Sequence, residues 1–158
     1  MRCILDKIEL KKCLSNDKKT EIVKILINDE DLTDILKEIE MPYAMAEGHP
    51  NLAGKYEGIA AQYIFYPSKH LLGEVNPILH YTEGKISVLD CSCGCYGCWP
   101  FEVKISIKED RIIWSNFEQP HRSFEIWNYK DLKPFVFDRK QYENEIIKYS
   151  NGNEKDGV

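Results

Sequence analysis

The sequence predicts an α+β protein: an antiparallel β-meander sheet with an N-terminal amphipathic helix and a C-terminal helix packed on one face. Residues 101–108 alternate between apolar and polar side chains, as in a strand with one buried face. Apolar residues recur at helical spacing over 32–39. Several short strand-like segments then follow one another between residues 78 and 117, separated by turn residues.

The opening segments, 7–14 and 22–27, predict a β-hairpin. The second is rich in β-branched residues and nearly continuous in apolar character, as in a buried strand. Asp31 can cap the helix that follows. Pro42 disfavours helical geometry at the preceding residue, so we expect the helix to end at Met41.

Residues 48–73 show neither a helical nor a strand period and contain scattered aromatics. We expect a long irregular segment, of a length that is uncommon in compact domains unless it is functional. Segments 78–81 and 85–89 flank Gly84, which suits the left-handed position of a tight hairpin.

The clearest strand, 101–107, turns at Glu109-Asp110 and returns along 111–117. Short strands are expected at 124–127 and 135–137. Asp138 then caps the C-terminal helix, with Gln141 placed as in a capping box. Tyr142, Ile146 and Tyr149 form its predicted buried stripe.

Length and composition indicate a single α+β domain over residues 1–149. Residues 150–158 offer almost nothing to bury and are expected to be a disordered tail. The formal net charge of −5 argues against a nucleic-acid partner, because phosphate neutralisation needs a basic face. No apolar run is long enough to span a membrane or form a signal-peptide core. A reducing cytoplasm follows, where cysteines act as thiols or metal ligands rather than disulfides.

Four of the six cysteines lie within eight residues: Cys91, Cys93, Cys95 and Cys98. Three interpretations remain open. The thiols are small buried groups in a glycine-rich bend, or they bind a metal such as zinc, or they form a reactive dithiol or nucleophile. Four zinc ligands on one tight loop are strained, so three cysteines completed by the distant His121 fit a tetrahedral site more easily.

Cys98 and His121 are also the candidate catalytic pair, with the histidine as base. The alternative for His121 is a solvated loop histidine. Trp99 follows the cysteines directly. Tryptophans lie more often in the core than on a contact surface.

Two blocks resemble a group of small, mostly bacterial soluble proteins for which we know no established activity. The blocks are C-x-C-G-x-x-G-C-W-P at 91–100 and W-S-x-F-x-Q-P-H-R at 114–122. The resemblance spans roughly residues 22–147 and includes Glu47-Gly-His-Pro50. It implies a three-thiol feature of Cys91, Cys93 and Cys98, with Cys95 in a variable position. It also draws attention to His49, His121 and Arg122 as binding candidates.

The leading hypothesis is a non-enzymatic protein-interaction or regulatory module with a structural cysteine loop, which zinc could stabilise. No catalytic constellation is assembled in the sequence, whereas an aromatic-rich sheet is. The alternative is a thiol- or metal-dependent enzyme, or a metal or redox sensor, that uses Cys98 or Cys93 with His121.

Overall fold

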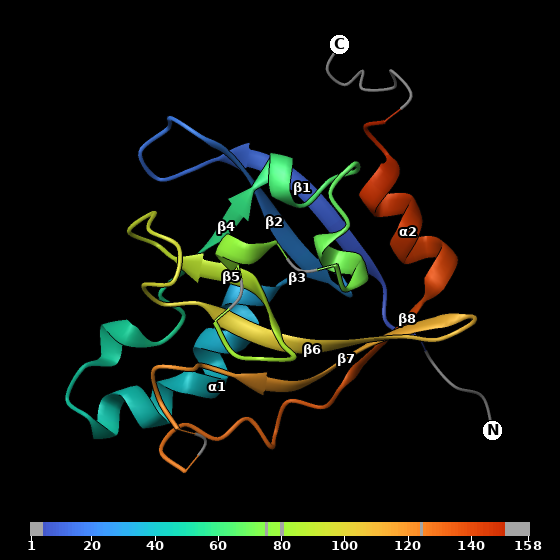
Figure 1. Ribbon diagram of the computed structural model, residues 1–158. Helices are drawn as coiled ribbons and strands as arrows, with labels where there is room; N and C mark the ends of the chain where they lie inside the picture. The colour runs from blue at the N-terminus through green and yellow to red at the C-terminus, as the bar shows by residue number, and fades with distance from the viewer. Residues whose placement is uncertain (1–4, 75, 80, 124, 151–158) are drawn as a thin grey trace.

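An eight-stranded antiparallel sheet with two α-helices forms the fold in the computed structural model, which describes residues 5–74, 76–79, 81–123 and 125–150 (Figure 1). The spatial strand order is β1-β2-β4-β5-β6-β7-β8, and β3 pairs with β2. The predicted α+β class and antiparallel meander are therefore confirmed. The strands are β1 (Ile8–Leu14), β2 (Glu21–Ile27), β3 (Glu30–Asp31), β4 (Tyr56–Ala60), β5 (Ile86–Cys91), β6 (Phe101–Ile107), β7 (Arg111–Glu118) and β8 (Phe135–Asp138).

The two edges of the sheet approach each other. β1 and β2 form the predicted hairpin, with Ile8 opposite Ile27. Just before β1, the amide of Asp6 donates to the carbonyl of Val136 in β8 at 2.7 Å. Helix α2 (Arg139–Ile147) contacts β1, β7 and β8, so it packs where both edges meet (Figure 1).

Helix α1 (Leu32–Ala46) begins at the predicted cap, where the Asp31 carboxylate accepts from the amide of Thr33. It contacts β2 and β3. The predicted end at Met41 is wrong, because the helix continues through Pro42. Buried residues on both sides of the proline, Glu40 and Ala44, anchor the two halves to the rest of the protein, and this packing overrides the local preference of proline.

The predicted irregular segment 48–73 contains a strand. Tyr56–Ala60 forms β4, and three short 3₁₀ helices surround it: η1 (Pro50–Leu52), η2 (Ala61–Tyr63) and η3 (His70–Leu72). β4 is short and contains Gly58, which lies so close to β2 that a Cβ atom there would meet the Val23 carbonyl oxygen at 2.1 Å. A glycine in a strand of only five residues leaves too few side chains to show a strand period in the sequence.

Two other predicted strands are also wrong. Segment 78–81 begins in the 3₁₀ helix η4 (Pro77–Leu79), where the Asn76 side chain accepts from the amide of Ile78; His80 lies outside the described residues. In segment 124–127, Trp127 lies in a turn closed by the Ser123 carbonyl, and Phe124 lies outside the described residues. Gly84 has the predicted left-handed backbone, at φ +82°, but the turn precedes β5 rather than joining two strands.

The C-terminal helix begins as predicted, since the Asp138 carboxylate accepts from the amide of Gln141. The reciprocal half of the capping box does not form. Instead, the Gln141 side-chain amide bonds to both the amide and the carbonyl of Ile8 in β1. Tyr142 and Ile146 are buried and Tyr149 is half-buried. The predicted tail beyond Ser150 lies outside the described residues.

Strand β6 shows the predicted alternation only in part. Phe101 and Val103 are fully buried, whereas Ile107 is 37% exposed, because the strand runs out beyond the core. Glu102, on the predicted polar face, is fully buried and accepts from the amide of Tyr81 at 2.8 Å. None of the helices in the described part of the chain is both long and apolar enough to cross a lipid bilayer.

Candidate metal-binding site

The cysteine-rich loop connects β5 to β6. All six residues of β5 are buried, and the strand ends at Cys91. The chain then turns through residues 92–98 and enters β6 at Phe101. The Cys91 thiol is buried, whereas Cys93, Cys95 and Cys98 are exposed. The loop therefore has one anchored sulfur and three that solvent can reach.

Asp90 holds the loop together. Its Oδ1 atom accepts from the amides of Cys91 at 2.8 Å and Trp99 at 3.4 Å, and its Oδ2 atom accepts from the amide of Gly97 at 2.9 Å. Burial raises the pKa of Asp90, although these donors oppose the shift. Our sequence analysis missed this residue. Its only local signal is an acid at the end of an apolar strand, directly before a loop rich in glycine.

Three of the four predicted sulfur ligands converge. The Sγ atoms of Cys91, Cys93 and Cys98 all lie within 4.8 Å of one another. Three thiolates bound to zinc at about 2.3 Å would lie roughly 3.8 Å apart, so a small contraction of the cluster suffices. This group could hold a metal ion, and it is the three-thiol set without Cys95 that the motif resemblance implies.

A backbone contact supports the same geometry. The amide of Cys93 donates to the sulfur of Cys91 at 3.3 Å, a contact that stabilises charge on sulfur. A hydrogen bond from the Cys91 side chain lowers the pKa of Cys93 to about 7, and burial raises the pKa of Cys91 to about 12. The hydrogen bond with Cys93 raises the pKa of Cys95. The Cys93 thiol therefore loses its proton at a lower pH than the Cys91 thiol.

His121 contacts the loop without joining the sulfur cluster. Its Nε2 atom lies 2.9 Å from the carbonyl oxygen of Gly97 and therefore carries the proton that it donates. The ring stacks on Trp99 at a centroid distance of 6.0 Å and meets Tyr81 edge-on at 4.8 Å. The structure places His121 beside the predicted ligands, with its Nδ1 atom in no hydrogen bond to the described part of the chain.

Two of the other predicted binding residues, Arg122 and Trp99, form a stacked cluster. The Arg122 guanidinium lies 5.0 Å from the ring centroid of Trp99 and bonds to the Glu47 carboxylate through Nε at 3.0 Å. Glu47 also accepts from the indole of Trp127, and the Arg122 contact lowers its pKa. Trp99 is buried in this cluster, whereas His49 is exposed. Arg122 and Trp99 thus support the loop from one side.

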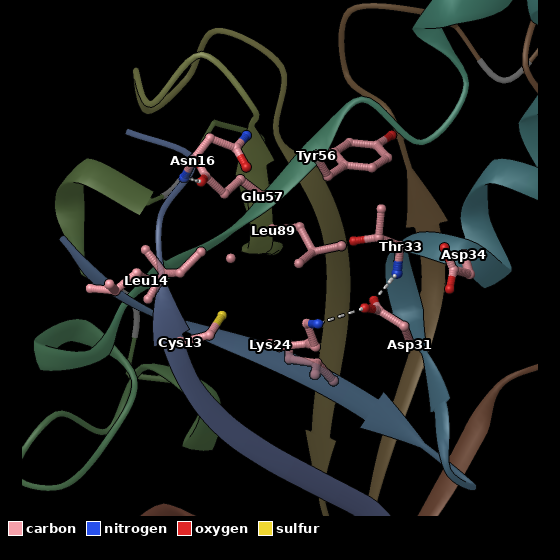
Figure 2. A pocket seen from close by; sticks show the side chains of 13 residues that line it. Cys13, Leu14, Asn16, Lys24, Asp31, Thr33, Asp34, Tyr56, Glu57 and Leu89 are labelled. Carbon is pink, nitrogen blue, oxygen red and sulfur yellow. Dashed lines mark hydrogen bonds and ion pairs between the residues drawn. The ribbon is translucent and has the colours of Figure 1, made fainter. Parts of the chain in front are cut away.

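Two cavities lie on the side of the β1–β2 hairpin. The smaller, of about 160 Å³, is lined by Cys91, Cys93 and Asp90 together with residues of the β1–β2 turn. The larger, of about 330 Å³, lies between β1, β2, β4 and the start of α1 (Figure 2). Cys13 lines it, near the ion pair of Lys24 with Asp31 at 3.8 Å. Cys13 is thus separate from the sulfur cluster.

A second group of titratable residues is structural. The buried Glu40 carboxylate accepts from the hydroxyls of Tyr56 at 2.6 Å and Tyr129 at 2.7 Å, and from the amide of Gly54 at 2.9 Å. Burial raises its pKa. Both carboxylate oxygens thus accept hydrogen bonds that join α1 to β4 and to the loop before β8, so this group stabilises the fold.

The fold and the sulfur cluster together define an α+β sheet protein with a three-cysteine site in which two cysteines are exposed and one is buried. Neither protein-family models, curated proteins nor solved structures give a match to the chain.

Proposed function

We propose that the protein is a non-enzymatic regulatory module that binds a zinc ion through Cys91, Cys93 and Cys98, and that the metal-ordered loop is recognised by a partner protein. The observation that carries the proposal is the convergence of three sulfur atoms within 4.8 Å. Soft thiolate ligands select zinc or monovalent copper over harder ions. Such a site, with free thiols on its surface, is suited to a reducing compartment such as the cytoplasm.

Zinc in a structural site has four ligands, so three thiolates leave one position. The predicted set offers two side chains for it: the Nδ1 atom of His121 and the thiol of Cys95. Both lie on or against the same loop. Zinc binding should stabilise the folded loop, because the ion holds the deprotonated ligands together and its binding free energy adds to the free energy of folding.

The geometry supports binding over catalysis. A thiol enzyme needs a base within hydrogen-bond reach of its nucleophile. The Nε2 atom of His121 donates to the Gly97 carbonyl, and in the described part of the chain neither ring nitrogen hydrogen-bonds to Cys93 or Cys98. The pair proposed as catalytic therefore lacks the contact that activation requires.

The test is metal binding by purified, reduced protein. Titration with Zn²⁺, and with Co²⁺ as a spectroscopic probe, should show one ion per chain and a thiolate-to-cobalt charge-transfer band. Cys91→Ser, Cys93→Ser and Cys98→Ser should each lower the affinity and the metal-dependent gain in stability together. Unfolding curves with and without a chelator measure that gain.

Cys13→Ser is the matched control, because this cysteine lines the other cavity. The variant should bind metal as the wild type does. His121→Ala and Cys95→Ser identify the fourth ligand: the variant that loses affinity supplied it. If none of the three cluster variants changes metal binding, or the wild type binds no metal, the proposal is wrong.

A further inference from the structure

The three sulfurs of the cluster differ in their exposure to solvent. Cys93 and Cys98 are exposed, whereas Cys91 is 2% exposed. A small oxidant can therefore reach the first two directly. Their Sγ atoms lie within 4.8 Å of each other, and a disulfide bond requires about 2.05 Å.

The loop between these cysteines has room to close the difference. Gly94 and Gly97 have left-handed backbones, at φ +90° and +85°, and a Cβ at either position would meet no atom within 4 Å. The sulfurs need to approach by up to roughly 3 Å. The Tyr96 hydroxyl and the Gly97 amide hold the middle of this loop to the rest of the protein. The approach therefore comes from rotation of the two exposed cysteine side chains and of the backbone at the glycines.

We propose that Cys93 and Cys98 form a reversible disulfide under hydroperoxide, and that this oxidation releases the bound metal. The disulfide depends only on the positions of the two thiols; the metal release rests on the proposed function. Oxidation would consume two of the three sulfur ligands and leave only Cys91 and the fourth ligand, whereas structural zinc sites use four.

The chemistry proceeds in two steps. The Cys93 sulfur attacks one oxygen of hydrogen peroxide; the O–O bond breaks, Cys93 becomes a sulfenic acid, and the leaving hydroxide takes up a proton to form water. The Cys98 sulfur then attacks the Cys93 sulfur; the S–S bond forms, the S–O bond breaks, and a second water leaves with the Cys98 proton. Two thiols are oxidised by two electrons, and one peroxide is reduced to two waters.

The structure favours this pair over the alternatives. Cys91 is buried, and its sulfur accepts a hydrogen bond from the amide of Cys93. This sulfur is therefore shielded from peroxide and from attack by another thiol. Cys95 is exposed and hydrogen-bonds to Cys93, but it is not one of the three residues whose sulfurs all lie within 4.8 Å of one another. A disulfide between residues only two apart would also close a small, strained ring. The structure thus assigns Cys93 and Cys98 as partners, while Cys91 stays reduced.

The experiment treats reduced protein, metal-free and zinc-loaded, with stoichiometric hydrogen peroxide. Free thiols are then blocked with iodoacetamide, the disulfide is reduced, and the released thiols are labelled with N-ethylmaleimide for tandem mass spectrometry. We expect the second label on Cys93 and Cys98 and the first label on Cys91 and Cys95. A colorimetric chelator should report zinc release in step with the disulfide, and dithiothreitol should restore binding.

Three variants separate the steps. Cys98→Ser should form no intramolecular disulfide and should trap a sulfenic acid on Cys93 that dimedone labels. Cys95→Ser should behave as the wild type does. Cys91→Ser should lose zinc affinity yet still form the Cys93–Cys98 disulfide, so failure of the metal site and failure of the redox pair give different results.

A disulfide that includes Cys91 or Cys95 would overturn the assignment. So would oxidation of Cys93 to the sulfinic acid with Cys98 intact, or full zinc retention after the Cys93–Cys98 disulfide has formed.

Discussion

The carboxylate of Asp90 accepts a hydrogen bond from the amide of Gly97 at 2.9 Å, joining the last turn of the cysteine loop to the strand that leads into it. The same side chain also accepts from the amides of Cys91 and Trp99. One buried acid thus fixes both ends of the loop and sets the distance between the first and last cysteines.

Asp90→Asn should destabilise the protein by about 1–3 kcal/mol, because the new NH₂ group cannot accept from the Gly97 amide and leaves that donor without its partner. The variant should also bind zinc more weakly. Urea unfolding and Zn²⁺ titration measure the two effects. Asp110→Asn is the control, since its side chain is 80% exposed. Equal stability of the two variants would show that Asp90 does not hold the loop.

Cys93 should be the cluster cysteine that reacts first with an alkylating agent. Hydrogen bonding lowers its pKa to about 7, whereas burial raises that of Cys91 to about 12, and only the thiolate is nucleophilic. In metal-free protein, the rate of Cys93 alkylation should rise with pH and be half-maximal near pH 7. Mass spectrometry of iodoacetamide-treated samples gives the rate at each cysteine. Cys13→Ser should leave this profile unchanged, and a midpoint at or above pH 9 would contradict the assignment.

The contribution of Glu40 to the free energy of unfolding should fall as pH rises. Because burial raises its pKa in the folded protein, the folded state binds the proton more tightly than the unfolded state. The free energy of unfolding therefore decreases from the ordinary glutamate pKa, about 4.3, up through the raised value. Glu40→Gln removes this contribution, so the stability difference between wild type and variant should shrink with increasing pH. Unfolding in urea across this range measures it.

The control for Glu40 is Glu38→Gln on the same helix, where the side chain is exposed; its difference from wild type should stay flat. A wild-type advantage over Glu40→Gln that grows with pH would show that the hydrogen bonds from Tyr56 and Tyr129 outweigh desolvation.

Gly58→Ala should cost about 3 kcal/mol or more, because the added methyl would lie 2.1 Å from the Val23 carbonyl oxygen and force β4 away from β2. Gly48→Ala is the matched comparison. That residue has a left-handed backbone at φ +81° but open space around it, so its substitution should cost about 1 kcal/mol. Thermal or urea unfolding of both variants tests the pairing of β2 with β4. Equal losses of stability in the two variants would contradict this pairing.

Several parts of this protein follow from local sequence signals. The caps at Asp31 and Asp138 and the left-handed Gly84 depend on residues within a few positions of one another. The β1–β2 hairpin pairs two strands that are consecutive in the sequence. The spacing of the cysteines likewise placed a thiol site in one short loop. Such features are predictable because neighbouring residues alone decide the backbone conformation.

Other parts were decided only by contacts between distant segments. β4 exists because Gly58 fits against Val23, and α1 continues past Pro42 because Glu40 is held by Tyr56 and Tyr129. Likewise, three cysteines rather than four converge because Asp90 ties the loop to the buried end of β5. In each case the deciding energy comes from close packing or from a carboxylate that satisfies remote hydrogen-bond donors, and neither leaves a period in the sequence.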